Sequence, residues 1–140
     1  MSTPEEAIRR TMGRYIQAHD TRNVDEIVNV FAEDGAFINS RGEWRGRPAI
    51  REFFEHSRTT AAPGSRMKLM CANSIITVEG ERAAAVTDVM IFRAEGDGPW
   101  HVPQAAQYAD TFVLTAGEWL YAEKNVTALP TEVPAAKASP

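Results

Sequence analysis

The sequence predicts an α+β domain in which three N-terminal helices pack on one face of a mostly antiparallel sheet. As far as Phe54, apolar residues recur at spacings of three and four, which is the period of an amphipathic helix. From Met67 onward the period changes to two and β-branched residues become frequent, as is typical of strands. Because the helices precede the strands instead of alternating with them, the helices should cover one face of an antiparallel sheet.

Each predicted helix begins at a recognisable cap or at a proline. Thr3–Glu6 combines a capping hydroxyl, a proline at the first helical position and a reciprocal glutamate. Asn23–Glu26 repeats the capping pattern, and we expect a short second helix that Gly35 ends. Pro48 opens the third helix, and the breaker loop 61–65 follows it.

One brief strand and four longer strands are expected after the second helix. Their predicted ranges are 36–40, 67–78, 83–93, 105–115 and 118–127. Residues 79–81 and 115–117 have the composition of hairpin turns, so the strands that flank them should be antiparallel. The segment 95–103 is too polar and too rich in glycine and proline for a strand, and we expect it to lie over the mouth of a pocket.

Size and composition indicate one domain. With 140 residues and 44% hydrophobic content, the chain can bury a single core but has no room for a second domain. We expect residues 1–129 to form this domain. Residues 130–140 are rich in proline and alanine with hardly any apolar anchor, and we expect them to form a disordered tail.

Charge and cysteine content narrow the function classes. The net charge of -4 comes from interspersed signs, so we expect no nucleic-acid or membrane partner. The absence of a signal peptide and of a long apolar run predicts a cytoplasmic protein whose partner is a small molecule or a second copy. Cys71 is the single cysteine, and a buried structural thiol is favoured over a nucleophile. The three histidines are too scattered for a metal motif, so we expect neither a metal nor a cofactor.

The first helix carries three candidate site residues near its end. Its apolar stripe includes Tyr15 and His19, so both side chains should face the interior. Asp20 stands where a negative charge opposes the helix macrodipole. Either His19 and Asp20 form a titratable couple at the pocket floor, or Asp20 caps the following turn and His19 is a core residue.

Two aspartates on the predicted strands are candidate acids or bases. By alternation, Asp88 shares a face with Val86 and Met90, and Asp110 shares a face with Tyr108. A buried carboxylate must be hydrogen-bonded or neutralised by a raised pKa, unless it faces solvent after all. A raised pKa suits a general acid or base, whereas pairing with an arginine on an exposed or dimer-facing surface would be structural.

Other side chains are expected to line the pocket and bind the substrate. Phe37 and Asn39 share one face of the first strand, and the Asn39 amide offers both a donor and an acceptor. The remaining predicted lining residues are Phe54, Met70, Met90, Trp100 and Tyr108.

Several stretches resemble the SnoaL-like branch of the nuclear transport factor 2-like superfamily. They are residues 14–27, 31–37, 44–54, 108–113 and 117–119, and the resemblance spans residues 4–127. The resemblance implies a cone-shaped, cystatin-like α+β barrel with a strongly curved sheet around an apolar pocket. It also implies frequent dimerisation through the sheet face, so we expect a homodimer. It does not fix one function, because this superfamily contains enzymes and non-enzymes.

Resemblances to two enzymes of the superfamily bear on the first helix. Against ketosteroid isomerase, Tyr15 and Asp110 fall at the oxyanion-hole positions, while Asn39 replaces the base. Against scytalone dehydratase, Asp20 matches the acidic residue after the first helix. The catalytic histidine of that enzyme falls near Leu69 or Met70 of this chain.

A third relative is limonene epoxide hydrolase. Asn39 and Asp88 match its water-orienting asparagine and one acid, and Glu123 falls near its second acid. Val86 and Phe37 stand at its arginine and tyrosine positions, so this catalytic set is also incomplete.

The resulting functional prediction is cofactor-independent acid/base chemistry on a hydrophobic, oxygenated small molecule. The reaction class would be dehydration, isomerisation or cyclisation, as in a lyase or an isomerase. We expect Asp88, Asp110 and His19 to transfer protons, while Tyr15 and Asp20 complete the catalytic set. The alternatives are a binding protein without turnover and an epoxide hydrolase that uses Asn39 and Asp88.

Overall fold

A computed structural model describes residues 2–129, and these residues form three helices and six strands. The helices are α1 (Pro4–Asp20), α2 (Val24–Asn29) and α3 (Arg47–Thr60). The strands are β1 (Phe31–Asn39), β2 (Gly42–Arg45), β3 (Ser65–Glu79), β4 (Arg82–Glu95), β5 (His101–Thr115) and β6 (Glu118–Ala128). The predicted tail, residues 130–140, lies outside the described residues.

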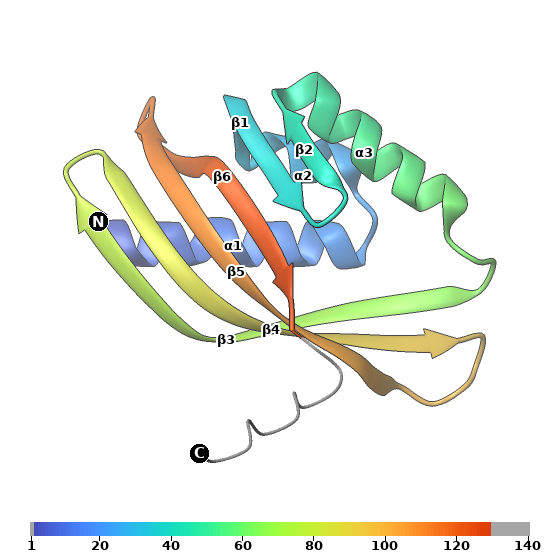
Figure 1. The fold of residues 1–140 in the computed structure, drawn as a ribbon. Coiled ribbons are helices and arrows are strands. Elements are labelled where there is room, and N and C mark those ends of the chain that lie inside the picture. Colours follow the sequence, from blue (N-terminus) through green and yellow to red (C-terminus); the bar gives the residue numbers. More distant parts are fainter. Residues whose placement is uncertain (1, 130–140) are drawn as a thin grey trace, which may run out of the picture.

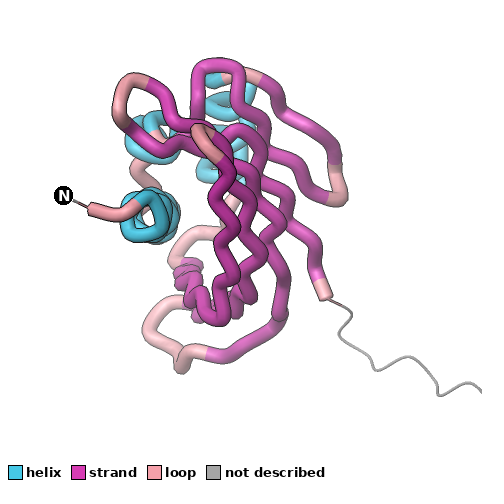
Figure 2. The backbone as a smooth tube through the Cα atoms, turned by 90° about the vertical axis from the view of Figure 1, so that its left-hand side faces the viewer, coloured by secondary structure: helices cyan, strands magenta, loops and turns pink. Residues whose placement is uncertain are grey.

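The strands form one open, strongly bent sheet. Its order is β2-β1-β6-β5-β4-β3, and every neighbouring pair is antiparallel except β1 and β6. Strands β3, β4 and β5 are long and curve below α1, while α2 and α3 lie beside β1 and β2 (Figure 1). Seen from the side, the helices lie on the concave side of the sheet (Figure 2). The predicted α+β architecture is confirmed. None of the helices within residues 2–129 is long and apolar enough to cross a membrane.

The predicted helix caps are confirmed. Thr3 Oγ1 accepts a hydrogen bond from the Glu6 backbone N–H at 3.1 Å, and Glu6 Oε2 accepts one from the Thr3 N–H at 3.0 Å. Asn23 Oδ1 accepts a hydrogen bond from the Glu26 N–H at 3.2 Å. These bonds satisfy backbone donors that a helix leaves free at its start. The caps therefore fix where α1 and α2 enter the domain.

The transition from α2 to β1 differs from the prediction. Helix α2 stops at Asn29 and β1 begins at Phe31, so Gly35 lies inside a strand and does not end a helix. Gly35 sits where the pairing of β1 with β6 shifts register. A Cβ atom there would lie 2.9 Å from the Tyr121 carbonyl oxygen. The position therefore needs glycine because two backbones approach each other closely. Strand β2 was not predicted, and it forms a short hairpin with β1 through a turn at residues 40 and 41.

Replacing Gly35 tests this close approach. We expect Gly35→Ala to lower the free energy of unfolding by about 1–3 kcal/mol, because β1 and β6 must move apart. Gly13→Ala is the matched control, since nothing lies within 4 Å of a Cβ atom at this helical position. The control should raise stability by about 0.5–1 kcal/mol. Urea unfolding measures both, and a Gly35→Ala protein as stable as the parent would contradict the account.

Candidate active site

A β-bulge in β6 places Lys124 inside the domain. The pairing of β5 with β6 shifts register between Thr111 and Phe112, which leaves one extra residue in β6 after Tyr121. In a regular strand, residues three apart point to opposite faces. With the extra residue, Tyr121 and Lys124 both point inward and are 1% and 0% exposed. The bulge therefore brings a cation into the core.

Lys124 forms a buried ion pair with Asp110 of β5. Lys124 Nζ donates to Asp110 Oδ2 at 3.2 Å, and both side chains are completely buried. Asp110 Oδ1 has no hydrogen-bond partner within residues 2–129. Burial raises the pKa of Asp110 and lowers the pKa of Lys124. The opposite charge of the partner works against both shifts, and the Asn125 backbone N–H also works against the shift of Asp110. The two pKa values therefore move toward each other, which favours proton exchange within the pair.

Three tyrosine rings surround the ammonium group of Lys124. Nζ lies 3.4 Å from the ring centroid of Tyr108, 4.5 Å from that of Tyr15 and 4.6 Å from that of Tyr121. These distances are within the range of cation–π attraction. We call Lys124, Asp110 and these three tyrosines the cage. The structure thus brings together three predicted site residues, Tyr15, Tyr108 and Asp110, from α1 and β5.

The cage tyrosines remain protonated at neutral pH. Burial is the largest cause that raises the pKa of Tyr15, and the negative charge of Asp110 adds to it. Burial also raises the pKa of Tyr108 and Tyr121 well above the ordinary value for tyrosine. A protonated phenol can donate a hydrogen bond to a ligand oxygen. The cage therefore combines hydroxyl groups with one carboxyl group and one amine.

His19 and Asp20 lie at the end of α1, next to the cage. The His19 ring lies 6.0 Å from that of Tyr15 and 6.5 Å from that of Phe54, so it faces the interior as predicted. The turn after α1 is closed by the backbone, with Arg22 N–H donating to the His19 carbonyl at 3.1 Å. Capping of this turn by Asp20 is therefore not what the structure shows.

Asp20 instead connects α1 to β3. It accepts hydrogen bonds from Lys68 Nζ at 2.5 Å and from the Leu69 N–H at 3.1 Å, and it contacts His19 Nδ1 at 3.4 Å. Burial raises the pKa of Asp20, but hydrogen bonds from His19, Lys68 and Leu69 together outweigh it and lower the pKa. Asp20 is therefore an ionised carboxylate at neutral pH. The resemblance to scytalone dehydratase places a histidine near this part of β3. In this chain, the charged side chain that pairs with Asp20 there is Lys68.

A cleft lies between α1 and β3, and none of the five cage residues lines it. Its volume is about 300 Å³. Its lining residues are Arg9, Met12, Gly13, Ile16, Gln17, Lys68, Leu69, Met70, Cys71 and Ser74. Burial raises the pKa of the Cys71 thiol to about 11, and the charges of Lys124 and Asp110 also influence it. Cys71 is therefore a protonated thiol at neutral pH.

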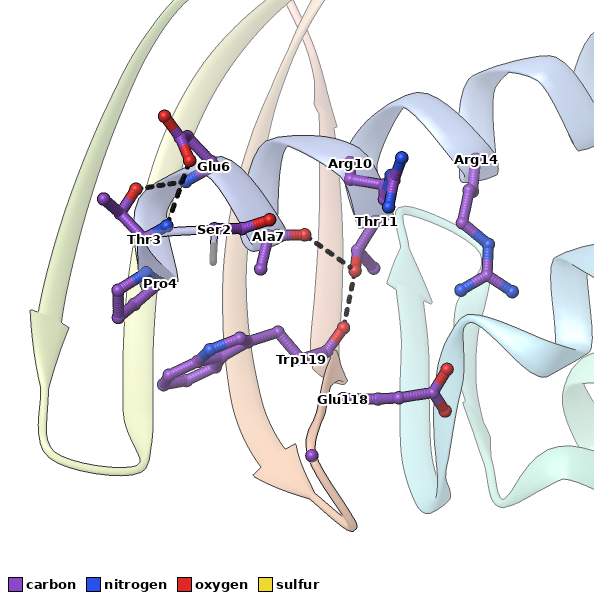
Figure 3. Close-up of a pocket in the computed structure, with 11 residues that line it drawn as sticks. Ser2, Thr3, Pro4, Glu6, Ala7, Arg10, Thr11, Arg14, Glu118 and Trp119 are labelled. Carbon is purple, nitrogen blue, oxygen red and sulfur yellow. Dashed lines mark hydrogen bonds between the residues drawn. The ribbon is translucent and has the colours of Figure 1, made fainter.

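A second cavity lies at the opposite end of α1. Its volume is about 610 Å³, and it opens between the start of α1 and the β5–β6 turn (Figure 3). Thr11 Oγ1 closes its inner wall by donating to the carbonyl oxygen of Trp119 at 2.5 Å. Arg14, which also lines it, is paired with Glu26 at 2.6 Å. None of the predicted site residues lines this cavity.

Asp88 and Met90 lie on the other face of the sheet, so their predicted place in the pocket is wrong. The inward side chains of β4 are Ala83, Ala85, Thr87 and Val89. Asp88 is exposed and accepts hydrogen bonds from Asn73 at 3.0 Å and from Gln107 at 3.5 Å. The small inward residues leave room for the large aromatic side chains of α1, β5 and β6. The large side chains of β4 therefore lie on its outer face and do not face the pocket as predicted.

The other predicted binding residues have separate roles. Met70 lines the cleft but is 53% exposed. Asn39 Oδ1 accepts a hydrogen bond from the Arg41 N–H at 2.8 Å, so its amide stabilises the β1–β2 turn. Phe37 and Phe54 are buried, with ring centroids 5.0 Å apart. Trp100 is 47% exposed below the Arg66 guanidinium, and it does not line the cleft.

The role of Asp20 has a pH signature. We expect Asp20→Asn to lower the free energy of unfolding at pH 7 by about 1–2 kcal/mol, because hydrogen bonds to a charged group are lost. The folded-state pKa of Asp20 is lowered, so its stabilisation is complete above the unfolded-state pKa of 3.8 and is lost as pH falls through the folded pKa. The difference between variant and parent should therefore shrink toward pH 3.

Urea unfolding at pH 7 and at pH 3 measures this difference. Asp34→Asn, at an exposed position of β1, is the control and should change stability little at either pH. A deficit for Asp20→Asn that is the same at both pH values would show that the charge of Asp20 contributes nothing.

The fold agrees with those of known structures. A nuclear transport factor 2-like protein with a cystatin-like fold from Novosphingobium aromaticivorans is 23% identical, with a TM-score of 0.79 over 91% of this chain and 83% of the other. A candidate scytalone dehydratase from the same organism is 22% identical, with a TM-score of 0.77 over 90% and 84%. A Catenulispora acidiphila protein in complex with S-DNPA is 21% identical, with a TM-score of 0.80 over 89% and 92%.

These likenesses establish the cystatin-like fold that the sequence predicted. No curated protein shows significant similarity to the chain. Residues 2–125 match the model of the SnoaL-like domain, and the chain therefore belongs to the SnoaL-like family.

Proposed function

We propose that the chain binds a hydrophobic, oxygenated small molecule at the cage and performs cofactor-independent acid/base chemistry on it. The reaction would be a dehydration, an isomerisation or a cyclisation. The observation that carries this proposal is the buried Asp110–Lys124 pair, which lies within three tyrosines and leaves Asp110 Oδ1 without a hydrogen-bond partner in residues 2–129.

A buried ion pair of this kind is poorly explained by stability alone. Well-packed apolar residues of similar volume often stabilise a fold as much as a buried pair or more. Within residues 2–129, Asp110 Oδ1 also has no hydrogen-bond partner, whereas buried polar atoms normally have one. Local violations of this kind are typical of functional sites. The pair is therefore best understood as a group that meets a ligand.

Three of the five cage residues have distinct tasks in the proposed chemistry. Asp110 takes a proton from the ligand and returns it, and Lys124 stabilises the carboxylate at 3.2 Å. Protonated Tyr15 is a donor for the ligand oxygen. His19 and Asp20 hold the end of α1 against the cage and against β3. Asp88 has no task, because it lies on the outer face.

Relatives of the same fold support this substrate class. One structural neighbour is a candidate scytalone dehydratase, and another is complexed with S-DNPA. The cleft between α1 and β3 is lined by apolar groups such as Met12, Ile16 and Leu69. Epoxide hydrolysis by Asn39 and Asp88 is not proposed, since Asn39 belongs to a turn and Asp88 faces the other way.

We further propose that the chain forms a homodimer through the outer face of the sheet. Met70, Ile75, Val86 and Met90 are 53%, 72%, 44% and 44% exposed on neighbouring strands. Apolar groups gathered on one surface are typical of interfaces. Size-exclusion chromatography with light scattering should give twice the 15.5 kDa mass of one chain. The Val86→Glu variant should give the mass of one chain. A parent protein that elutes at 15.5 kDa would contradict this proposal.

The central test compares two aspartates on opposite faces of the sheet. Native mass spectrometry of protein from its source cells identifies a retained compound, whose turnover is then followed. Asp110→Asn should lower the rate by about a hundredfold or more, because one positioned acid or base contributes that much. Asp88→Asn is the matched control and should leave the rate unchanged.

Either of two results would oppose the catalytic proposal. If Asp110→Asn turns the compound over as fast as the parent protein, Asp110 is not the catalytic acid or base. A compound that the parent protein leaves unchanged after long incubation would favour binding without turnover.

A further inference from the structure

We propose that the cleft between α1 and β3 is a second binding site, which takes a small apolar carboxylate. The apolar chain of this ligand lies beside Gly13, and its carboxylate meets Arg9. The inference is independent of the proposed function, because none of the five cage residues lines the cleft.

Gly13 leaves open space in the wall of the cleft. It lies in the middle of α1, where glycine favours a helix less than alanine does. Close packing does not explain the glycine, since nothing lies within 4 Å of a Cβ atom at this position. Gly13 is nevertheless one of the residues that line the cleft. A glycine that weakens its helix and keeps a cleft open is better explained by a ligand than by packing.

The walls beside Gly13 are apolar and come from two elements. Met12 and Ile16 belong to α1, while Leu69 and Cys71 belong to β3, which is an edge strand that curves below α1 (Figure 1). Met12 and Leu69 are buried. The volume of about 300 Å³ is at the lower end of the range for small-molecule sites. The cleft therefore suits a short apolar chain.

The charged residues that line the cleft are both cations. Within residues 2–129, Arg9 and Lys68 line it, and no aspartate or glutamate does. Lys68 is paired with Asp20, the last residue of α1. Arg9 lies about three helical turns before Asp20, so the two cations are at opposite ends of the cleft. The charge of Lys68 is thus balanced by the protein, and that of Arg9 remains to be considered.

Arg9 is the cation that is available to a ligand. Its Nη2 lies 3.7 Å from Glu5 Oε1, and the two side chains are 51% and 53% exposed. Ion pairs between exposed side chains contribute little, so a ligand carboxylate can replace Glu5 at small cost. The guanidinium group also presents two parallel N–H donors to a carboxylate. A ligand with an apolar chain and one carboxylate therefore matches both the walls and the charge.

Calorimetric titration with octanoate and 1-octanol tests the role of charge. The two compounds have the same chain length, but only octanoate is an anion. Arg9→Gln should weaken octanoate binding about fivefold, since a partly exposed ion pair contributes that much, and should leave 1-octanol binding unchanged. Arg10→Gln is the matched control and should change neither, because Arg10 does not line the cleft. Unchanged octanoate binding by Arg9→Gln would overturn the inference.

Gly13→Leu tests the location of the ligand. Leucine is a good helix former and has open space at this position, so the variant should melt no lower than the parent protein. Its side chain should fill the cleft and weaken the binding of both compounds at least about tenfold, because burial of a few methylene groups is worth that much. Parent-like binding by a folded Gly13→Leu protein would contradict the proposed site.

Cys71 reports the position of the ligand in the unaltered protein. It lines the cleft and is the single cysteine of the chain, so intact mass follows its alkylation by iodoacetamide. Octanoate at ten times its Kd should slow this reaction about tenfold, because only the ligand-free protein reacts. An unchanged rate would overturn the inference, whatever the stability of the variants.

Two further variants separate the cleft from other apolar parts of the molecule. Asp110→Asn alters the cage and Val86→Glu alters the outer face of the sheet, and both should bind octanoate as the parent protein does. Loss of binding by a folded Asp110→Asn protein would place octanoate at the cage, and loss by Val86→Glu would place it on the outer face. Either result would overturn the inference. Failure of the cleft leaves the proposed function standing, because that function is tested by turnover at the cage.

Discussion

The bulge in β6 is the constraint on which the interior of this domain depends. It adds one residue between Tyr121 and Lys124, so that a tyrosine ring and an ammonium group face the same side of the sheet. The ammonium group then requires a counter-charge, which Asp110 provides from the neighbouring strand. The rings of Tyr15 and Tyr108 exclude water from the pair, and this exclusion shifts both pKa values toward proton exchange.

The two faces of β4 show how the same sheet serves the interior and the outer surface. Small inward residues such as Ala83 and Ala85 leave space for the cage, while Val86 and Met90 point outward. The bulk on the inner face therefore comes from the helix and from the neighbouring strands. The outer face carries the exposed apolar side chains that the proposed homodimer would cover.

The fold could be predicted from the sequence much more fully than the site. Caps, a change of period and hairpin turns are local signals, and they located α1, α3 and the four long strands. Tyr15 and Asp110 were placed inside correctly by periodicity. Asp88 was misplaced because alternation says which residues share a face but not which face is inward. Lys124 was missed because a bulge reverses alternation, and neither the bulge nor the Asp110 partner is visible in local sequence.

Titration of the buried pair tests the central claim most directly. Carbon-13 NMR of the Asp110 carboxyl group and nitrogen-15 NMR of Lys124 Nζ can follow each proton separately. The account predicts that Asp110 loses its proton above its ordinary pKa of 3.8 and that Lys124 loses its proton below its ordinary pKa of 10.5. Titration of Asp110 at or below 3.8 together with Lys124 at or above 10.5 would contradict it, because the pair would then be a structural salt bridge.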